Sequence, residues 1–107
     1  RPNMASIANY SGALHYLKAI ADMGVAASKA SGAEVVARMK AIPCDDDAFG
    51  AGSIRADGRK LCPSYLFEVK APSVSRGPYD YYKLLQTTPA NEAFRPMNEG
   101  NCPLVRA

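Results

Sequence analysis

The longest regular pattern of apolar positions in this chain lies near its N-terminus. Between Met4 and Gly24 these positions recur at alternating steps of three and four residues, the spacing of one α-helical face. They are Ile7, Tyr10, Leu14, Leu17, Ala21 and Gly24. With Asn3 as N-cap and Gly24 as C-cap, the pattern predicts a helix from about Met4 to Met23. We expect Gly12 to allow close approach of another backbone, and a broad apolar partner surface to cover the helix.

A second helix is predicted between a short connection and a proline. Residues 25–30 form the connection, and Ser31 then begins a capping box that Glu34 completes. Pro43 ends the helix because proline has no N–H to donate. The apolar side of this helix consists of Val35, Val36, Met39 and Ile42. A connection of this length favours two neighbouring, antiparallel helices.

The next stretch of the chain predicts a loop, a turn and a strand. Residues 44–53 are polar and contain glycines, which indicates a loop. Asp57-Gly58 favours a hairpin because glycine adopts positive φ freely. Residues 61–69 then alternate, with aromatic and branched side chains on one face, as in a half-buried strand. Pro63 cannot donate to a ladder, so the start of this strand should lie at an edge or a bulge.

The last stretch predicts one more strand and a tail. Residues 79–88 are apolar on both sides, as in a strand buried on both faces or covered by a partner. Residues 89–107 contain four breakers and few periodic apolar positions, which indicates an extended tail that docks on another surface. The predicted fold class is α+β, in a single segment 1–107 with helices over residues 1–43 and strands and tail over residues 44–107. These elements offer little material to cover the first helix, so we expect a segment of a larger protein or one completed by a partner chain.

Composition narrows the function classes. The chain has 107 residues, 48% of them hydrophobic, and a net charge of +3. Its Lys and Arg residues are scattered among ten acids, so nucleic acid is not expected as a partner. No apolar run approaches the ~18 residues of a membrane span. Three cysteines without CxxC spacing indicate free buried thiols, or one pairing with a cysteine outside this segment; they are Cys44, Cys62 and Cys102.

Neither a metal site nor a phosphate-binding loop is predicted. The acidic run 45–47 lacks the spacing and closing Glu of an EF-hand loop, which favours a solvated acidic loop over calcium binding. The glycines of 50–52 have no preceding strand and no third spaced glycine. We therefore expect no metal and no cofactor.

No catalytic residue is predicted either. His15 is the only histidine, and a Cys–His nucleophile pair would need a cysteine beside it together with an orienting third group. A histidine next to an apolar stripe is more often satisfied by packing or half-exposed. Tyr79, Tyr81 and Tyr82 suit stacking on bases or aromatic ligands, but without a basic groove we favour packing in the sheet. Arg55, Asp57 and Arg59 are expected to solvate the hairpin end.

Several sequence runs carry a family resemblance together and in order. The runs are Tyr10–Ala19, Ile54–Arg59, Gly77–Lys83, Ala93–Pro96 and Cys102–Val105. They resemble the C-terminal part of substrate-binding proteins of ABC importers, in the type I periplasmic (branched-chain-amino-acid-type) family. The resemblance implies a periplasmic solute receptor rather than an enzyme, and a two-lobed α/β fold to which this chain contributes. It also implies that a small amino-acid-like or aromatic carboxylate solute binds in the cleft and that the loaded form meets an ABC permease in the membrane.

The resemblance places one cleft-wall position just before the long helix, at Met4 and Ala5. A helix N-terminus there can also attract a carboxylate through its free N–H groups. The alternative is that Met4 and Ala5 only cap or pack the helix end.

A second function class stays open. The same sequence fits a self-standing interaction module that exchanges strands or its tail and binds no small molecule. As an isolated segment it is expected to form a homo-oligomer, because its apolar stripe and strand edges would seek partners.

Overall fold

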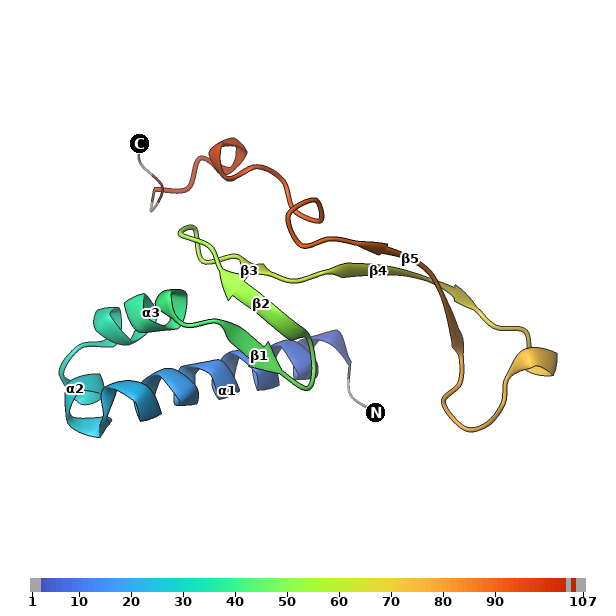
Figure 1. Cartoon of the computed structure of the whole chain (residues 1–107), viewed down its shortest axis with the longest axis horizontal. Coiled ribbons are helices and arrows are strands. Elements are labelled where there is room, and N and C mark those ends of the chain that lie inside the picture. The colour runs from blue at the N-terminus through green and yellow to red at the C-terminus, as the bar shows by residue number, and fades with distance from the viewer. Residues whose placement is uncertain (1–2, 104, 106–107) are drawn as a thin grey trace.

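The computed structural model describes residues 3–103 and 105, and Figure 1 shows helices followed by two small antiparallel sheets. The helices are α1 (Met4–Met23), α2 (Val25–Ala30) and α3 (Gly32–Ala41). One sheet holds β1 (Cys44–Asp46), β2 (Gly50–Ile54) and β3 (Lys60–Leu61), and the other holds β4 (Ser64–Val69) and β5 (Tyr82–Thr88). Two short 3₁₀ helices complete the list, Pro72–Val74 and Met97–Gly100. The α+β class is as predicted; the residues that fall outside the description are Arg1, Pro2, Leu104, Arg106 and Ala107 of the two ends.

The two predicted helices form with their predicted caps. The Asn3 side chain accepts a hydrogen bond from the Ser6 N–H at 2.9 Å, and Ser31 Oγ accepts one from Glu34 N–H at 3.3 Å. Gly24 ends α1 with φ 84°. The connection 25–30 is helical instead of irregular, which corrects the two-helix prediction. Its alanines and lysine are good helix formers, and the Gly24 backbone turns the chain so that α2 begins at once.

The predicted loop 44–53 is wrong, because most of it is the β1–β2 hairpin with Cys44 opposite Gly52. The Asp46 side chain accepts hydrogen bonds from the N–H groups of Ala48 and Phe49, at 3.0 and 2.6 Å, which folds the chain back after β1. Gly50 has φ 68° and leads into β2. The hairpin predicted at Asp57-Gly58 is confirmed as the connection of β2 to β3.

The single strand predicted over 61–69 is divided at Pro63 into β3 and β4. β4 pairs with β5 from Ser64 opposite Thr88 to Val69 opposite Tyr82, with an irregularity between Leu66 and Phe67. Every residue of β4 is exposed, so its prediction as half-buried is wrong for this chain. The reason is that β5 pairs with one edge of β4, while no other described element covers either face of this two-stranded sheet.

The buried core is small and lies under a different face of α1 from the one predicted. Fully buried apolar residues among those described are Ala19, Val35 and Cys44, and the buried polar residues are Ser11 and His15. Ser11, His15 and Ala19 recur every four residues and face α3 and β1. The predicted stripe stays largely exposed, since Tyr10 and Leu17 retain 49% and 59% of their surface. The close approach predicted at Gly12 is also wrong, because a Cβ there would meet nothing within 4 Å.

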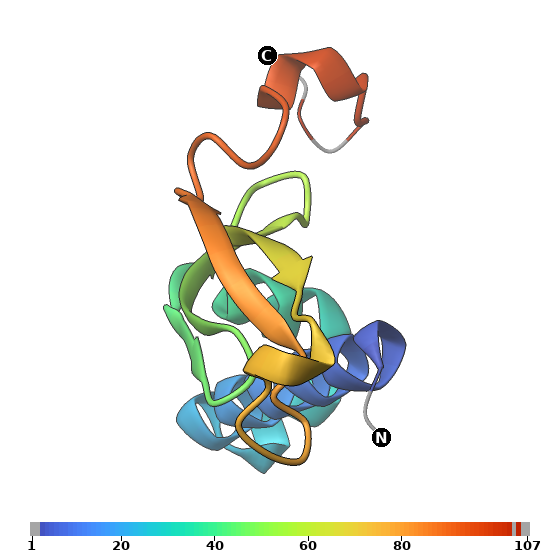
Figure 2. The ribbon, with the colours of Figure 1, turned by 90° about the vertical axis from the view of Figure 1, so that its right-hand side faces the viewer.

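The chain exposes more surface than a folded protein of its size. Its accessible area is 7983 Å², against about 5,800 Å² expected for its mass of 11.4 kDa. Its radius of gyration is 17.3 Å, against about 13 Å for a compact domain of this length. Figure 2 shows the C-terminal end of the chain extending away from the helices. The apolar surface therefore exceeds what these elements bury, as the sequence pattern indicated.

Candidate functional site

The residues predicted to line a cleft lie at the first turn of α1. Met4 begins the helix with 86% of its surface exposed, and Ala5 beside it is also exposed. Asn3 satisfies two N–H groups of this turn, since its side chain binds Ser6 N–H and its carbonyl binds Ile7 N–H at 3.0 Å. Within residues 3–103, the N–H groups of Met4 and Ala5 have no such partner. The helix end therefore presents two donors and the positive end of its dipole to the surroundings.

Met4 borders two open hollows. The larger, of about 790 Å³, lies between α1, the β1–β3 sheet and the tail. The smaller, of about 610 Å³, lies between the start of α1 and β4, and Ile7, Phe49, Tyr65 and Phe67 share it with Met4. Ala5 lines neither hollow, so the structure brings one of the two predicted residues to a concave surface and leaves the other on the open helix end.

Two residues that line the larger hollow, Lys60 and Ser11, are both bonded to Asp46, and Lys60 and Asp46 form a partly buried ion pair. Lys60 Nζ donates to Asp46 Oδ2 at 2.8 Å and to Ser11 Oγ at 2.6 Å, and Ser11 Oγ donates to the same carboxylate oxygen at 2.6 Å. The Asp46 side chain is only 4% exposed, and Lys60 also lies 4.7 Å from the centre of the Phe49 ring. Burial raises the pKa of Asp46, but the hydrogen bonds from Lys60, Ser11 and the backbone outweigh it and hold that pKa well below its usual range.

All three aspartates of the acidic run are tied to α1, which corrects the prediction of a solvated acidic loop. Beside the bond of Ser11 to Asp46, the Tyr10 hydroxyl donates to Asp47 Oδ1 at 2.8 Å, and Lys18 Nζ donates to the Asp45 carbonyl. The described residues contain no group of three or more His, Cys, Asp or Glu side chains placed to hold a metal ion. The acidic run acts as a clamp between β1 and α1.

Sequence reasoning missed this clamp. Ser11 and Asp46 are 35 residues apart in the sequence. Lys60 comes after the Asp57-Gly58 turn, in a third part of the chain. No spacing rule connects them. The one local signal was Ser11 itself, because a serine in a helix interior weakens the helix unless its side chain bonds another part of the chain.

The structure does bring His15 and a cysteine together, yet not as a nucleophile pair. His15 Nε2 lies 2.8 Å from the Met39 carbonyl and 3.6 Å from Cys44 Sγ. A carbonyl oxygen can only accept a hydrogen bond, so His15 Nε2 carries the hydrogen and donates a hydrogen bond to the Met39 carbonyl. It therefore cannot take a proton from the thiol, and burial raises the pKa of Cys44, which keeps the thiol protonated. The geometry is that of a packed histidine.

Arg55 and Arg59, at the end of the β2–β3 hairpin, contact the tail as well as the solvent. Arg55 binds Asp57 through two N–H groups, at 2.9 and 2.6 Å, and donates a third to the Arg95 carbonyl at 3.0 Å. The Arg55 guanidinium lowers the pKa of Asp57 to about 2. Arg59 lies 5.6 Å from the centre of the Phe94 ring. These contacts dock the tail on the β2–β3 turn, as predicted for a tail that docks.

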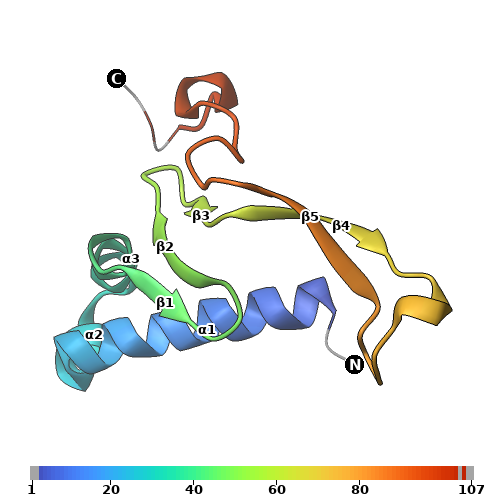
Figure 3. The same cartoon turned by 45° about the vertical axis from the view of Figure 1, so that its right-hand side comes forward.

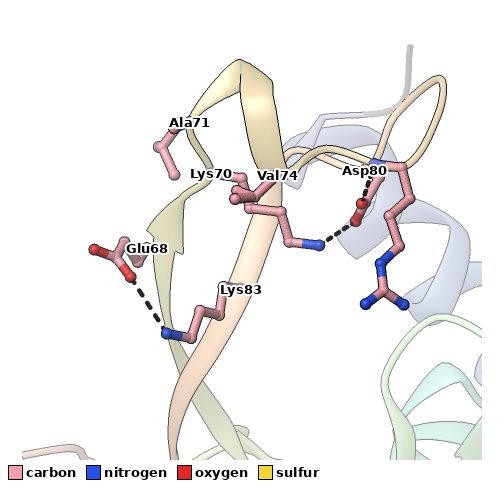
Figure 4. Close-up of a pocket in the computed structure, with 8 residues that line it drawn as sticks. Glu68, Lys70, Ala71, Val74, Asp80 and Lys83 are labelled. Atoms are coloured by element: carbon pink, nitrogen blue, oxygen red, sulfur yellow. Dashed lines mark hydrogen bonds and ion pairs between the residues drawn. The ribbon is translucent and has the colours of Figure 1, made fainter.

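A third hollow, of about 790 Å³, lies at the far end of the β4–β5 hairpin (Figure 4). Lys70 Nζ binds Asp80 at 2.6 Å and Lys83 lies 3.9 Å from Glu68, while Arg76 lines the hollow as a third cation. The Lys70 hydrogen bond lowers the pKa of Asp80. The hollow therefore offers two ion pairs and the further positive charge of Arg76.

Comparison with known proteins identifies the class. A family model described as periplasmic binding protein matches residues 1–77. The structure of a periplasmic binding protein from Burkholderia mallei is 39% identical, covers 94% of this chain and has a TM-score of 0.80. That of a branched-chain amino acid ABC transporter periplasmic ligand-binding protein from Burkholderia xenovorans LB400 is 36% identical over 89%, with a TM-score of 0.75. A search of curated proteins finds no match. The chain belongs to the periplasmic binding protein family.

The family binds solutes for transport and is not a family of enzymes. This chain spans about a quarter of each solved relative, 26% and 24% of their lengths. The likeness agrees with the predicted segment of a two-lobed α/β binding protein. None of the described helices is long and apolar enough to cross a bilayer.

Proposed function

We propose that this chain belongs to the solute-binding component of an ABC importer. Its solute is a small amino-acid-like or aromatic carboxylate compound, bound in a cleft of which the start of α1 is one wall. The observation that carries the proposal is the family match together with two relatives at 36–39% identity, one of them described as a ligand-binding protein of a branched-chain amino acid ABC transporter. Periplasmic location, docking on a membrane permease and the absence of catalytic activity belong to the same proposal.

Met4 and Ala5 are proposed as the residues of this chain at the solute. The exposed helix end supports this role, because two N–H donors and the helix dipole favour a carboxylate. Met4 adds an apolar side chain beside these donors, and the small Ala5 leaves room for a ligand.

The test is calorimetry on the complete binding protein that carries this segment, with a panel of amino acids and aromatic carboxylates. Ala5→Trp places a large side chain at the second residue of α1, and we expect it to weaken binding of the best ligand at least tenfold. Ala33→Trp is the matched control, because Ala33 is also the exposed second residue of a helix, α3, and should leave affinity unchanged. No ligand in the panel, or equal affinity for both variants, would contradict the proposal.

The second candidate is the self-associating interaction module, which the large exposed apolar surface favours. We expect the isolated chain to form a homo-oligomer by light scattering under either hypothesis. Solute binding by the complete protein distinguishes the two, since the module would bind none.

A further inference from the structure

The β2–β3 turn contains the dipeptide that is most prone to spontaneous aspartate isomerisation. Asp57 is the only Asp or Asn of this chain that a glycine follows. In this reaction the backbone nitrogen of the following residue attacks the side-chain carboxyl carbon, and glycine has no Cβ to hinder that approach. The rate therefore depends on how firmly the fold holds Asp57 and Gly58.

The reaction has two steps and needs no reactant other than water. Gly58 N bonds to Asp57 Cγ, and one carboxyl oxygen leaves as water with the carboxyl proton and the amide hydrogen, which gives a succinimide ring. Water then adds to the main-chain carbonyl carbon of Asp57, the bond from that carbon to Gly58 N breaks, and the nitrogen regains a hydrogen. The product is isoaspartate, which has the mass of aspartate but carries the backbone through Cγ and is one carbon longer.

The folded turn holds both reacting groups. The Gly58 N–H donates to the Arg55 carbonyl at 2.8 Å. Arg55 Nε and Nη2 donate to the two carboxylate oxygens of Asp57 at 2.9 and 2.6 Å, and the Arg59 N–H donates to Oδ1 at 3.2 Å. These bonds favour the ionised carboxylate, whereas loss of water requires the protonated acid. The reaction therefore needs a local opening of the turn.

The same arginine connects the turn to the tail. Arg55 Nη1 donates to the Arg95 carbonyl at 3.0 Å, and Figure 3 shows the turn beside the tail that follows β5. Within the turn, the Arg55 N–H donates to the Arg59 carbonyl at 2.9 Å across Asp57 and Gly58. One more backbone carbon between these partners changes the spacing that the turn bonds require. Isoaspartate at position 57 would therefore displace Arg55 and break its contact with the tail.

We propose that Asp57-Gly58 is a site of spontaneous isomerisation, that the Arg55 guanidinium restrains the reaction in the folded chain, and that isoaspartate formation releases the tail. This inference does not depend on the proposed function or on which solute is bound.

The test compares the folded 107-residue chain with a synthetic peptide of residues 41–60 during prolonged incubation at neutral pH. Cleavage after lysine releases the same peptide from the chain, because it lies between Lys40 and Lys60. Electron-transfer fragmentation in a mass spectrometer then distinguishes isoaspartate from aspartate of equal mass. We expect isomerisation to be at least tenfold slower in the folded chain than in the peptide, and Arg55→Met to remove most of that protection.

Arg59→Met is the matched control. Arg59 meets Asp57 through its backbone N–H, which the substitution keeps, and its guanidinium lies 5.6 Å from the centre of the Phe94 ring. This variant should isomerise at the wild-type rate. Circular dichroism shows whether each variant keeps its helices. Arg55→Lys keeps the charge but not the two-pronged bond, so it should give an intermediate rate, and it decides the question if the methionine variant unfolds.

The tail is followed in the same samples. After limited chymotrypsin digestion of the aged wild-type chain, the fraction cleaved after Phe94 should contain several-fold more isoaspartate than the intact fraction. Equal isoaspartate in the two fractions overturns the release of the tail. Equal rates in the folded chain and the peptide, an unchanged rate in Arg55→Met, or the same acceleration in Arg59→Met overturns the restraint by Arg55.

Discussion

Replacing Lys60 with methionine tests whether its partly buried ion pair with Asp46 holds the β1–β3 sheet to α1. The substitution keeps the length of the side chain and removes its charge, so Asp46, whose side chain is 4% exposed, is left buried without a counter-ion. Removing one partner of a buried pair costs about 3–5 kcal/mol. Asp46 keeps its bonds from Ser11, Ala48 and Phe49, which places the cost near the lower end, about 3 kcal/mol.

The assay is urea unfolding of the dilute chain followed by circular dichroism at pH 7. Lys83→Met is the matched control, since Lys83 is 65% exposed and 3.9 Å from Glu68, and such pairs contribute on the order of 0.2 kcal/mol. Equal losses of unfolding free energy in the two variants would refute the reasoning.

The pH dependence gives a second check on the same pair. The pKa of Asp46 is lower in the folded chain than the ~3.9 of an unfolded aspartate, so its contribution to stability is complete above about pH 4. That contribution is lost as the pH falls toward the folded pKa. We expect the difference in unfolding free energy between wild type and Lys60→Met to be smaller at about pH 2.5 than at pH 7. An unchanged difference would contradict the lowered pKa of Asp46 in the folded chain.

Two further predictions concern a close contact and the docked tail. Gly52→Ala would place a Cβ 2.5 Å from the Leu61 carbonyl oxygen, and should lower the free energy of unfolding by about 1–3 kcal/mol in the same urea assay. Gly12→Ala, inside α1, places a Cβ that meets nothing within 4 Å and should raise that free energy by about 0.5–1 kcal/mol. Arg55→Met removes the bond to the tail carbonyl, so chymotrypsin should cleave after Phe94 several-fold faster; an unchanged rate would show that this bond does not hold the tail.

The sequence predicted the helix ends and the turn that residues next to them in the chain determine. Asn3, Gly24 and Ser31 set the helix ends, and Asp57-Gly58 set the β2–β3 hairpin. The β1–β2 hairpin was missed because its turn depends on one side chain, Asp46, binding two backbone N–H groups. An acidic run gives the same sequence signal whether it is solvated or bonded in this way.

The candidate site was predictable only to a limited extent. The choice of Met4 and Ala5 came from a family resemblance; both residues are exposed, and their place at a solute stays a prediction. The buried face of α1 was placed wrongly because apolar periodicity marks a helical face without naming its partner, and here polar side chains make the contacts with the sheet and α3. In this chain Ser11 and His15 meet the sheet and α3, while most of the apolar stripe stays exposed.

The attachment of α1 through three consecutive aspartates has a consequence for its direction. Hydrogen bonds prefer narrow angles, whereas apolar contacts tolerate sliding and rotation. Tyr10, Ser11 and Lys18 each meet a different residue of β1 or the turn that follows it, so the helix is pinned at three points along its length. An apolar replacement of these contacts would hold α1 as firmly but leave its axis free to swivel, and the end that carries Met4 would then point in no single direction.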